Sequence, residues 1–251
     1  MAADAYPRPL SPREREWLEW ILPSERPGYN AYRQIILGLS VIGEGRRGEG
    51  ELILGPAGEL PDFSMPLPAV LAYGMIETDA GKISVTAREL LEGQASIEIV
   101  SHASSGIPER FTETRRWMYS NWNAGSPCPQ CGKAIRETSM HAPGGKKFVL
   151  AICVTDRKIW FFDAETQIVH LIPVTNFHNE LMLHKNIRDP KLALDPKRLF
   201  TQLGEYTDED LTYAFLTYNK LRPKVALESS VESDVKESGA LLGRLKKLFK
   251  N

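Results

Sequence analysis

The strongest constraint on the fold is a pair of strand-like runs joined by a tight turn. Residues 69–78 and 82–90 are rich in aliphatic side chains, and Asp79-Ala80-Gly81 separates them. In the second run, isoleucine and valine alternate with polar residues in Ile83-Ser84-Val85-Thr86. Because successive side chains of a strand point to opposite faces, this alternation indicates a strand with one buried face. The pattern predicts an antiparallel hairpin.

Further strand-like runs fall into two groups along the chain. Glycine- and proline-rich segments separate them, as is typical of short antiparallel strands. The first group adds residues 33–42, 51–54 and 96–100 to the hairpin, and the second group consists of residues 147–154, 158–163 and 167–174. We therefore expect an α+β fold that is mainly antiparallel sheet, built from two strand groups.

Helix signals lie at both ends of the chain and between the strand groups. Ser11, Pro12 and Glu14 form a capping-box pattern that begins an N-terminal helix, and Pro23 ends it. Residues 108–122 have a helix-compatible pattern. From Pro190 onward the pattern becomes helical again. The predicted C-terminal helices begin near Asp195-Pro196 and near Thr207 and end at about Leu203 and Leu221.

Composition narrows the class of protein. The chain has 251 residues, 42% of them hydrophobic and 25% charged, which is ordinary for a globular protein. A net charge of -1 argues against a body built to bind nucleic acid. No apolar run approaches eighteen residues, so we expect no transmembrane span. Three cysteines and no signal-peptide pattern fit a reducing compartment, so we expect a cytoplasmic protein.

The cysteines carry the clearest chemical signal. Cys128-Pro129-Gln130-Cys131-Gly132 resembles half of a zinc ribbon, because two thiolates three positions apart on a tight turn can face one ion. A structural zinc ion needs four ligands, and no second C-x-x-C is present. The resemblance implies a site of Cys128, Cys131, His141 and Cys153. Two alternatives stay open: a metal-free turn with Cys153 buried in its strand, and a redox-active C-x-x-C.

The last thirteen residues predict a basic amphipathic helix at the end of a tether. Residues 224–238 are rich in serine and glutamate, which is typical of a disordered linker. In residues 239–251, apolar side chains recur with helical spacing and basic ones lie mostly beside them. The apolar residues are Leu241, Leu242, Leu245, Leu248 and Phe249, and the basic ones are Arg244, Lys246, Lys247 and Lys250.

This tail resembles the membrane-targeting helices that end some bacterial peripheral proteins. The resemblance implies binding to an anionic membrane surface, at the cytoplasmic face of a membrane. A single short helix of this kind would bind weakly and reversibly. Two alternatives stay open: docking into the groove of a partner protein, and packing back onto the protein's own body.

Other motifs fail in context, and we predict no catalytic residue from them. Residues 43–48 match G-x-G-x-x-G, but a strand follows where the dinucleotide motif requires a helix, so we interpret them as a hairpin tip. No kinase, zincin or serine-hydrolase signature is present. Basic and aromatic residues interleave around Arg115 and Trp117, a pattern that can stack nucleic-acid bases but is also typical of a packed helix.

These patterns predict an N-terminal docking helix, two sheet regions, a tether and a tail helix. In this order, the predicted boundaries are 1–28, 29–125, 126–223, 224–238 and 239–251. Alternatively, the two sheet regions, 29–125 and 126–223, form one domain. We expect a non-catalytic binding or assembly protein, peripherally membrane-associated or a subunit of a larger complex. The alternative is an enzyme or nucleotide-binding protein with a site stabilised by a zinc knuckle. A metal with an open coordination position would favour the enzyme.

Overall fold

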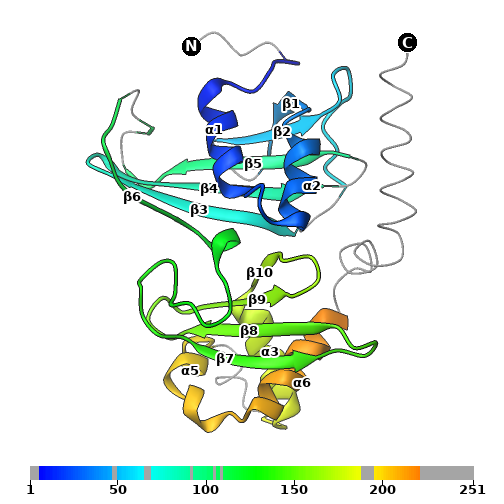
Figure 1. Cartoon of the computed structure of the whole chain (residues 1–251), viewed down its shortest axis with the longest axis vertical. Coiled ribbons are helices and arrows are strands. Elements are labelled where there is room, and N and C mark those ends of the chain that lie inside the picture. Colours follow the sequence, from blue (N-terminus) through cyan, green and yellow to red (C-terminus); the bar gives the residue numbers. More distant parts are fainter. Residues whose placement is uncertain are drawn as a thin grey trace. The chain divides into compact units, whose positions relative to one another are not determined.

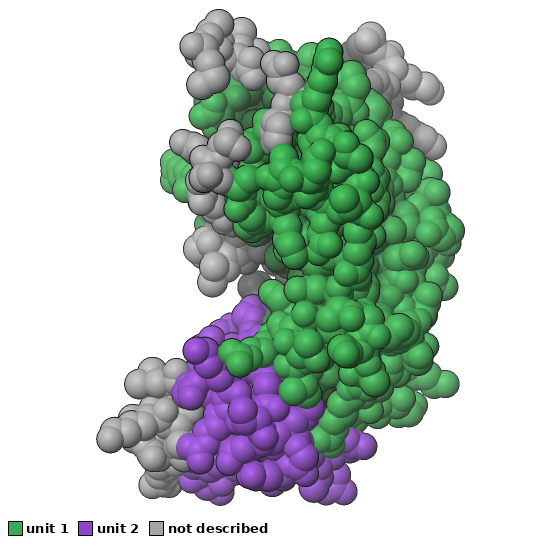
Figure 2. All heavy atoms as spheres, turned by 90° about the vertical axis from the view of Figure 1, so that its left-hand side faces the viewer, with its two compact units in different colours: residues 1–172 green, residues 173–251 purple. Residues whose placement is uncertain are grey.

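The computed structural model describes residues 6–46, 50–64, 69–90, 93–103, 106–107, 110–187 and 195–220. The chain divides into two compact units, Met1–Ile172 and Pro173–Asn251 (Figure 2). Both strand groups belong to the first unit, and the second unit is helical. The division therefore falls after the last strand and not between the two strand groups.

A six-stranded antiparallel sheet forms the first part of unit 1 (Figure 1). Its strand order is β1-β2-β5-β4-β3-β6. The predicted hairpin is confirmed as β3 and β4, and its turn places Gly81 at φ +131°, a conformation that favours glycine. The strands are β1 (Ser40–Glu44), β2 (Glu51–Gly55), β3 (Val70–Thr78), β4 (Gly81–Glu89), β5 (Ala95–Ser101) and β6 (Glu113–Met118).

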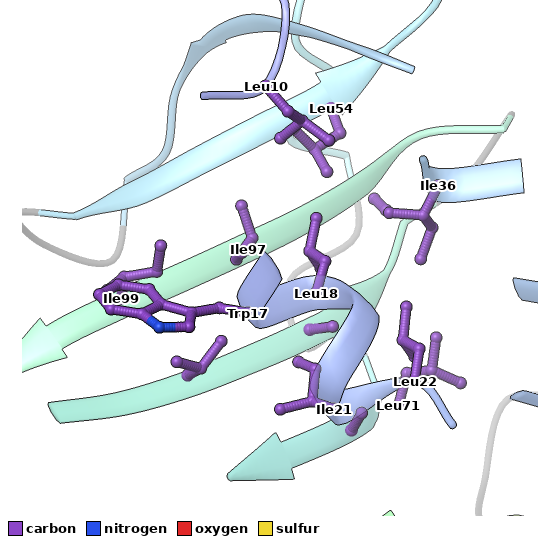
Figure 3. Close-up of a cluster of buried hydrophobic side chains, with 14 of the residues drawn as sticks. Leu10, Trp17, Leu18, Ile21, Leu22, Ile36, Leu54, Leu71, Ile97 and Ile99 are labelled. Carbon is purple, nitrogen blue, oxygen red and sulfur yellow. The ribbon is translucent and has the colours of Figure 1, made fainter. Parts of the chain in front are cut away.

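Two helices, α1 (Pro12–Ile21) and α2 (Pro27–Ile36), precede this sheet. The predicted capping box begins α1: the Ser11 side chain accepts from Glu14 N at 3.2 Å, and Ser11 N donates to the Glu14 carboxylate at 2.7 Å. The apolar side of α1 packs on one face of the sheet (Figure 3). The labelled core includes Trp17, Leu18 and Ile21 of α1 together with Ile97 and Ile99 of β5.

Two elements of this half differ from the sequence predictions. The run 33–42 is not one strand, because its first residues belong to α2, which begins at Pro27 and continues to Ile36. Tyr29 and Ile36 are buried one heptad apart on that helix. The predicted helix 108–122 is wrong as well. Its centre is the edge strand β6, in which Trp117 pairs with Met75 of β3, followed by the 3₁₀ turn η1 (Tyr119–Asn121).

A second antiparallel sheet of four strands completes unit 1 and confirms the α+β class. Its order is β10-β9-β8-β7. The strands are β7 (Arg136–His141), β8 (Lys147–Cys153), β9 (Lys158–Asp163) and β10 (Val169–Ile172). Aromatic side chains from both sheets form one cluster, in which Tyr119 lies 5.0 Å from Trp160 and 5.4 Å from Trp117, measured between ring centroids.

Two buried polar side chains at the start of α2 connect this helix to the end of η1 and to β10 of the second sheet. The Arg26 guanidinium donates to the Trp122 carbonyl at 2.9 Å and to the Asn123 side chain at 2.8 Å. The Tyr29 hydroxyl accepts from Val169 N at 3.0 Å and donates to Val169 O at 3.2 Å. Because burial without partners would be costly, these bonds fix where η1 and β10 lie.

The second unit contains α3 (Val174–His184), α5 (Lys197–Thr201), the 3₁₀ turn η2 (Leu203–Glu205) and α6 (Asp208–Lys220). The helices predicted near residues 195 and 207 are confirmed as α5 and α6, whereas α3 occupies a stretch for which the sequence predicted no helix. α3 and α6 pack against each other. The predicted tether 224–238 and tail helix 239–251 lie outside the described residues. None of the helices that the structure describes combines the length and the apolar character needed to cross a bilayer.

Asp210 is the polar centre of unit 2. Its carboxylate accepts from Thr207 N at 2.9 Å, while the Thr207 hydroxyl accepts from Asp210 N at 3.2 Å, which closes a capping box at the start of α6. Lys185 and His184 of α3 lie 2.7 and 3.2 Å from the same carboxylate. Burial acts to raise the pKa of Asp210, but the Lys185 ammonium and the Thr207 donors outweigh it and lower the pKa to about 2.

We predict that Asp210→Asn lowers the free energy of unfolding by about 1–2 kcal/mol at pH 7, as for a lost helix cap. Because the folded pKa of Asp210 lies below its ordinary value of 3.8, the carboxylate stabilises the fold above about pH 4, and this stabilisation is lost as the pH falls through about 2. Thermal melts of both proteins between pH 7 and pH 2 measure it. A difference between the two proteins that does not shrink with acid would contradict the assignment.

Candidate metal centre

Three cysteines and one aspartate converge at one end of the four-stranded sheet. The donor atoms of Cys128, Cys131, Cys153 and Asp156 all lie within 4.8 Å of one another. Cys128 Sγ is 3.1 Å from Asp156 Oδ2, Cys153 Sγ is 3.4 Å from the same oxygen, and the sulfurs of Cys131 and Cys153 are 3.6 Å apart. All three cysteines are free thiols. Together these four side chains could bind a metal ion.

The first half of the site is a turn in the connection from η1 to β7. Cys128 N donates to Lys133 O at 2.9 Å and Gly132 N donates to Cys128 O at 2.8 Å, so the chain folds back on itself within six residues. Gly132 has a φ of +69°, which explains the glycine of the C-P-x-C-G motif. The backbone N–H groups of Gln130 and Cys131 are directed at the Cys128 sulfur and favour its thiolate form.

The second half is the turn that joins β8 to β9. Cys153 ends β8, and Asp156 lies three residues later, the same spacing as between Cys128 and Cys131. Asp156 N donates to Cys153 Sγ at 3.4 Å, which repeats the bond from Cys131 N to Cys128 Sγ. The pattern C-x-x-D therefore stands where a complete zinc ribbon has its second C-x-x-C. The sequence contains this spacing, but the predicted ligand set combines Cys153 with His141 and leaves out Asp156.

The prediction of His141 as the fourth ligand is corrected by the strand register. In the β7–β8 pair, His141 lies opposite Lys147, and Ile152 lies opposite Arg136. Cys153 is six residues further along β8 than Lys147, which is about 20 Å at the rise of an antiparallel strand. His141 is thus at the far end of the hairpin and exposed. Asp156 takes its place in the cluster.

The four side chains of the cluster differ in their exposure to solvent. Cys128 and Cys153 are 1% and 0% exposed, whereas Cys131 and Asp156 are half-buried. Burial raises the pKa of Cys153 to about 11 and that of Cys128 further, with the neighbouring Asp156 carboxylate contributing to both. Without a cation, these raised pKa values keep the Cys128 and Cys153 sulfurs protonated at neutral pH. A bound metal ion reverses this balance, because its charge displaces the thiol protons.

Side chains of the six-stranded sheet and η1 hold the first turn in place. The Arg115 guanidinium of β6 donates to the carbonyls of Pro129 and Gln130, at 3.0 and 2.8 Å. The Tyr119 hydroxyl lies 3.4 Å from Gln130 Oε1. Tyr119 is buried among the cysteines, and burial and the nearby negative groups keep its pKa far above the ordinary value. Such contacts outside the ligand set orient the ligands themselves.

The distances fit one ion better than any covalent link between sulfurs. In a tetrahedral site with metal–sulfur bonds of about 2.3 Å, two sulfurs are about 3.8 Å apart, close to the separation of Cys131 and Cys153. A disulfide would need about 2.05 Å. The predicted redox-active C-x-x-C would join Cys128 to Cys131, whereas the sulfur contact that Cys131 makes is with Cys153.

The other motifs of the sequence form ordinary structure where they are described. Gly43 is part of β1, and Gly45 N donates to Glu51 O at 2.8 Å, so the glycine-rich segment begins a β1–β2 hairpin as expected. His102 Nε2 lies 3.0 Å from the Ser84 hydroxyl on neighbouring strands. The residues of the predicted membrane- or partner-binding tail lie outside the described part.

Comparison with known protein families, curated proteins and solved structures found no match.

We predict that the purified protein binds one transition-metal ion per chain and that Cys128→Ser and Asp156→Asn both weaken this binding. The loss should exceed the roughly 10–100-fold that removal of an outer-shell partner costs. His141→Ala is the matched control and should leave the metal content unchanged. Elemental analysis and titration with Co²⁺, whose thiolate complexes absorb visible light, measure both quantities. Equal losses in the His141 and Asp156 variants would refute the ligand set.

Proposed function

We propose that this protein is a non-catalytic binding or assembly protein whose fold is stabilised by a structural zinc ion. The observation that supports it is the convergence of Cys128, Cys131, Cys153 and Asp156 within 4.8 Å, from two turns of equal spacing. In this proposal zinc holds the two turns together, and the sheets present the surface that binds a partner.

The donor set favours zinc over other ions. Three thiolates are soft ligands, which disfavours Mg²⁺ and Ca²⁺, and the single carboxylate is also a ligand that Zn²⁺ accepts. Four donors around one point suit tetrahedral coordination, the usual geometry of structural zinc sites. The sulfur separation of 3.6 Å between Cys131 and Cys153 is close to what a mononuclear site of this geometry requires.

The same donor set favours a structural role over catalysis. Catalytic zinc sites use three protein ligands and keep one position for water or substrate. Here a fourth donor, the Asp156 carboxylate, lies within 3.1–3.4 Å of two of the sulfurs. The enzyme alternative would require Asp156 to leave the ion. A Co²⁺ spectrum that changes on addition of a small anion such as cyanide would support that alternative.

The contacts around the site indicate what zinc would stabilise. The first turn lies under Arg115 of β6, and the second turn joins β8 to β9. Fixing the two turns to one ion would therefore connect the edge of the six-stranded sheet with the centre of the four-stranded sheet. Because metal binding to the folded state alone adds its free energy to stability, the joint between the sheets would depend on the ion.

Removal of zinc should lower the melting temperature by about 5–10 °C, which corresponds to about 2.7 kcal/mol at a free zinc concentration of 100 Kd. Asp156→Cys, which supplies a fourth thiolate at the same position, should bind zinc more tightly and raise the melting temperature of the loaded protein. Calorimetry of metal-loaded and chelator-treated protein measures both effects. A melt that is insensitive to chelator would exclude a structural zinc ion.

We further propose that residues 239–251 recruit the protein to an anionic membrane surface. The support is the sequence pattern: Leu241, Leu245 and Leu248 recur with helical spacing, and no acidic residue interrupts the basic ones. Each Lys or Arg near an anionic surface contributes about 1 kcal/mol, so a single copy would bind weakly and reversibly. The flexible composition of residues 224–238 suits a tether between this segment and the body.

The full-length chain should float with anionic vesicles at low salt, float less at physiological salt, and remain unbound to neutral vesicles. A chain ending at Pro223 and the double variant Leu245→Glu, Leu248→Glu should not float. Glu232→Gln, which changes one charge in the tether, is the control and should bind as well as the unaltered chain. Flotation of the truncated chain, or no flotation of the full-length chain, would contradict recruitment by this segment.

A further inference from the structure

Two of the three sulfurs of the metal centre are placed to react with each other. Cys131 Sγ and Cys153 Sγ are 3.6 Å apart, and they come from different turns of the chain. Cys131 is half-buried and is the least buried of the three cysteines, whereas Cys153 is 0% exposed. A partly exposed thiol beside a sheltered one is the arrangement of an attacking and a resolving thiol.

We propose that Cys131 and Cys153 are an oxidative modification site, at which a peroxide converts the two thiolates into a disulfide and releases the metal ion. This inference rests on the proposed zinc function, because the ion keeps both sulfurs as thiolates until they react. It adds a regulated state to that function: a zinc-bound form and a metal-free, disulfide-bonded form of the same protein.

The chemistry balances with hydrogen peroxide as the oxidant. The Cys131 thiolate attacks one peroxide oxygen, so that an S–O bond forms, the O–O bond breaks and hydroxide leaves. The Cys153 thiolate then attacks the Cys131 sulfur, an S–S bond forms, and the S–O bond breaks with loss of a second hydroxide. The peroxide gains two electrons, and each sulfur loses one. A thiol reductant then reduces the disulfide to two thiols, and the reductant itself becomes a disulfide.

Loss of the metal follows from the number of donors that remain. A disulfide between Cys131 and Cys153 leaves Cys128 and Asp156 as the two protein ligands of a site that had four. Two donors do not hold a tetrahedral zinc ion, so the ion departs. The sulfurs would need to approach each other by roughly 1.5 Å, a movement within the reach of a turn.

The geometry selects this pair over Cys128 and Cys131. Cys128 is 1% exposed, its sulfur lies 3.1 Å from the Asp156 carboxylate, and the backbone N–H groups of Gln130 and Cys131 are directed at it. The Cys131 sulfur contacts the Cys153 sulfur of the other turn at 3.6 Å. The two pairings are easily told apart, because trypsin places Cys128 and Cys131 in one peptide, residues 117–133, and Cys153 in another, residues 148–157.

The test treats the zinc-loaded full-length protein with hydrogen peroxide and follows zinc release with a chromogenic chelator. We expect one zinc ion released per disulfide, a cross-link between peptides 117–133 and 148–157, and recovery of binding after a thiol reductant and zinc are added. Cys131→Ser should abolish the cross-link. Cys128→Ser, assayed with enough zinc to keep the ion bound, should retain it.

Three results would overturn the proposal: a disulfide within peptide 117–133, sulfinic acid at Cys131 without a cross-link, or zinc that stays bound. None of these results would contradict the proposed zinc site, because the protein contains the ion before peroxide is added. A protein that never binds zinc would instead refute the proposed structural role. In that protein the mapped cross-link still reports whether Cys131 and Cys153 react together.

Discussion

The joint between the two sheets depends on how the buried group of sulfurs and one carboxylate is neutralised. Cys128 and Cys153 are almost fully buried, and the Asp156 oxygen lies within 3.4 Å of both sulfurs. Burial of the two sulfurs disfavours their thiolate forms unless a cation compensates the charge. A single divalent ion would do so and would also join both turns, whereas protons neutralise the site without holding it together. Metal binding at this cluster would therefore add to the contacts that attach the four-stranded sheet to its surroundings.

Aromatic packing provides the second part of that joint. Tyr73 and Trp117 lie on one face of the six-stranded sheet, and Trp160 lies on β9 of the other sheet. Tyr119 lies between them, with ring centroids 5.4 Å from Trp117 and 5.0 Å from Trp160. Cys128 and Cys153 belong to the same apolar cluster as these rings. The metal centre is thus built into the edge of a core, and the rings exclude water from the buried side of the sulfurs.

The sequence predicts those parts of this architecture that depend on neighbouring residues. The β3–β4 hairpin and the capping box of Ser11 and Glu14 are local patterns, and both are present. The sequence of β6 predicts a helix because its arginines and aromatic residues fit the period of a helix as well as that of a strand. The segment is a strand because it pairs with β3, and no local sequence pattern contains that pairing. The first turn of the metal centre could be predicted from its motif. The fourth member of the cluster cannot be predicted from the residue types that zinc prefers. The register of β7 and β8 places His141 far from the cysteines, and the turn after Cys153 brings Asp156 close to them.

β6 connects the metal centre with the opposite face of its own sheet. Because side chains alternate along a strand, Arg115 and Arg116 point to opposite faces. Arg115 donates to the carbonyls of the first cysteine turn, while Arg116 pairs with Glu113 and with Glu16 of α1 and lies over the Trp20 ring. β6 is an edge strand that pairs with one neighbour, β3, so fewer backbone bonds resist its displacement than in a central strand. A change in the cysteine turn that moved Arg115 would therefore also displace Arg116 and the exposed side of α1 that Arg116 contacts.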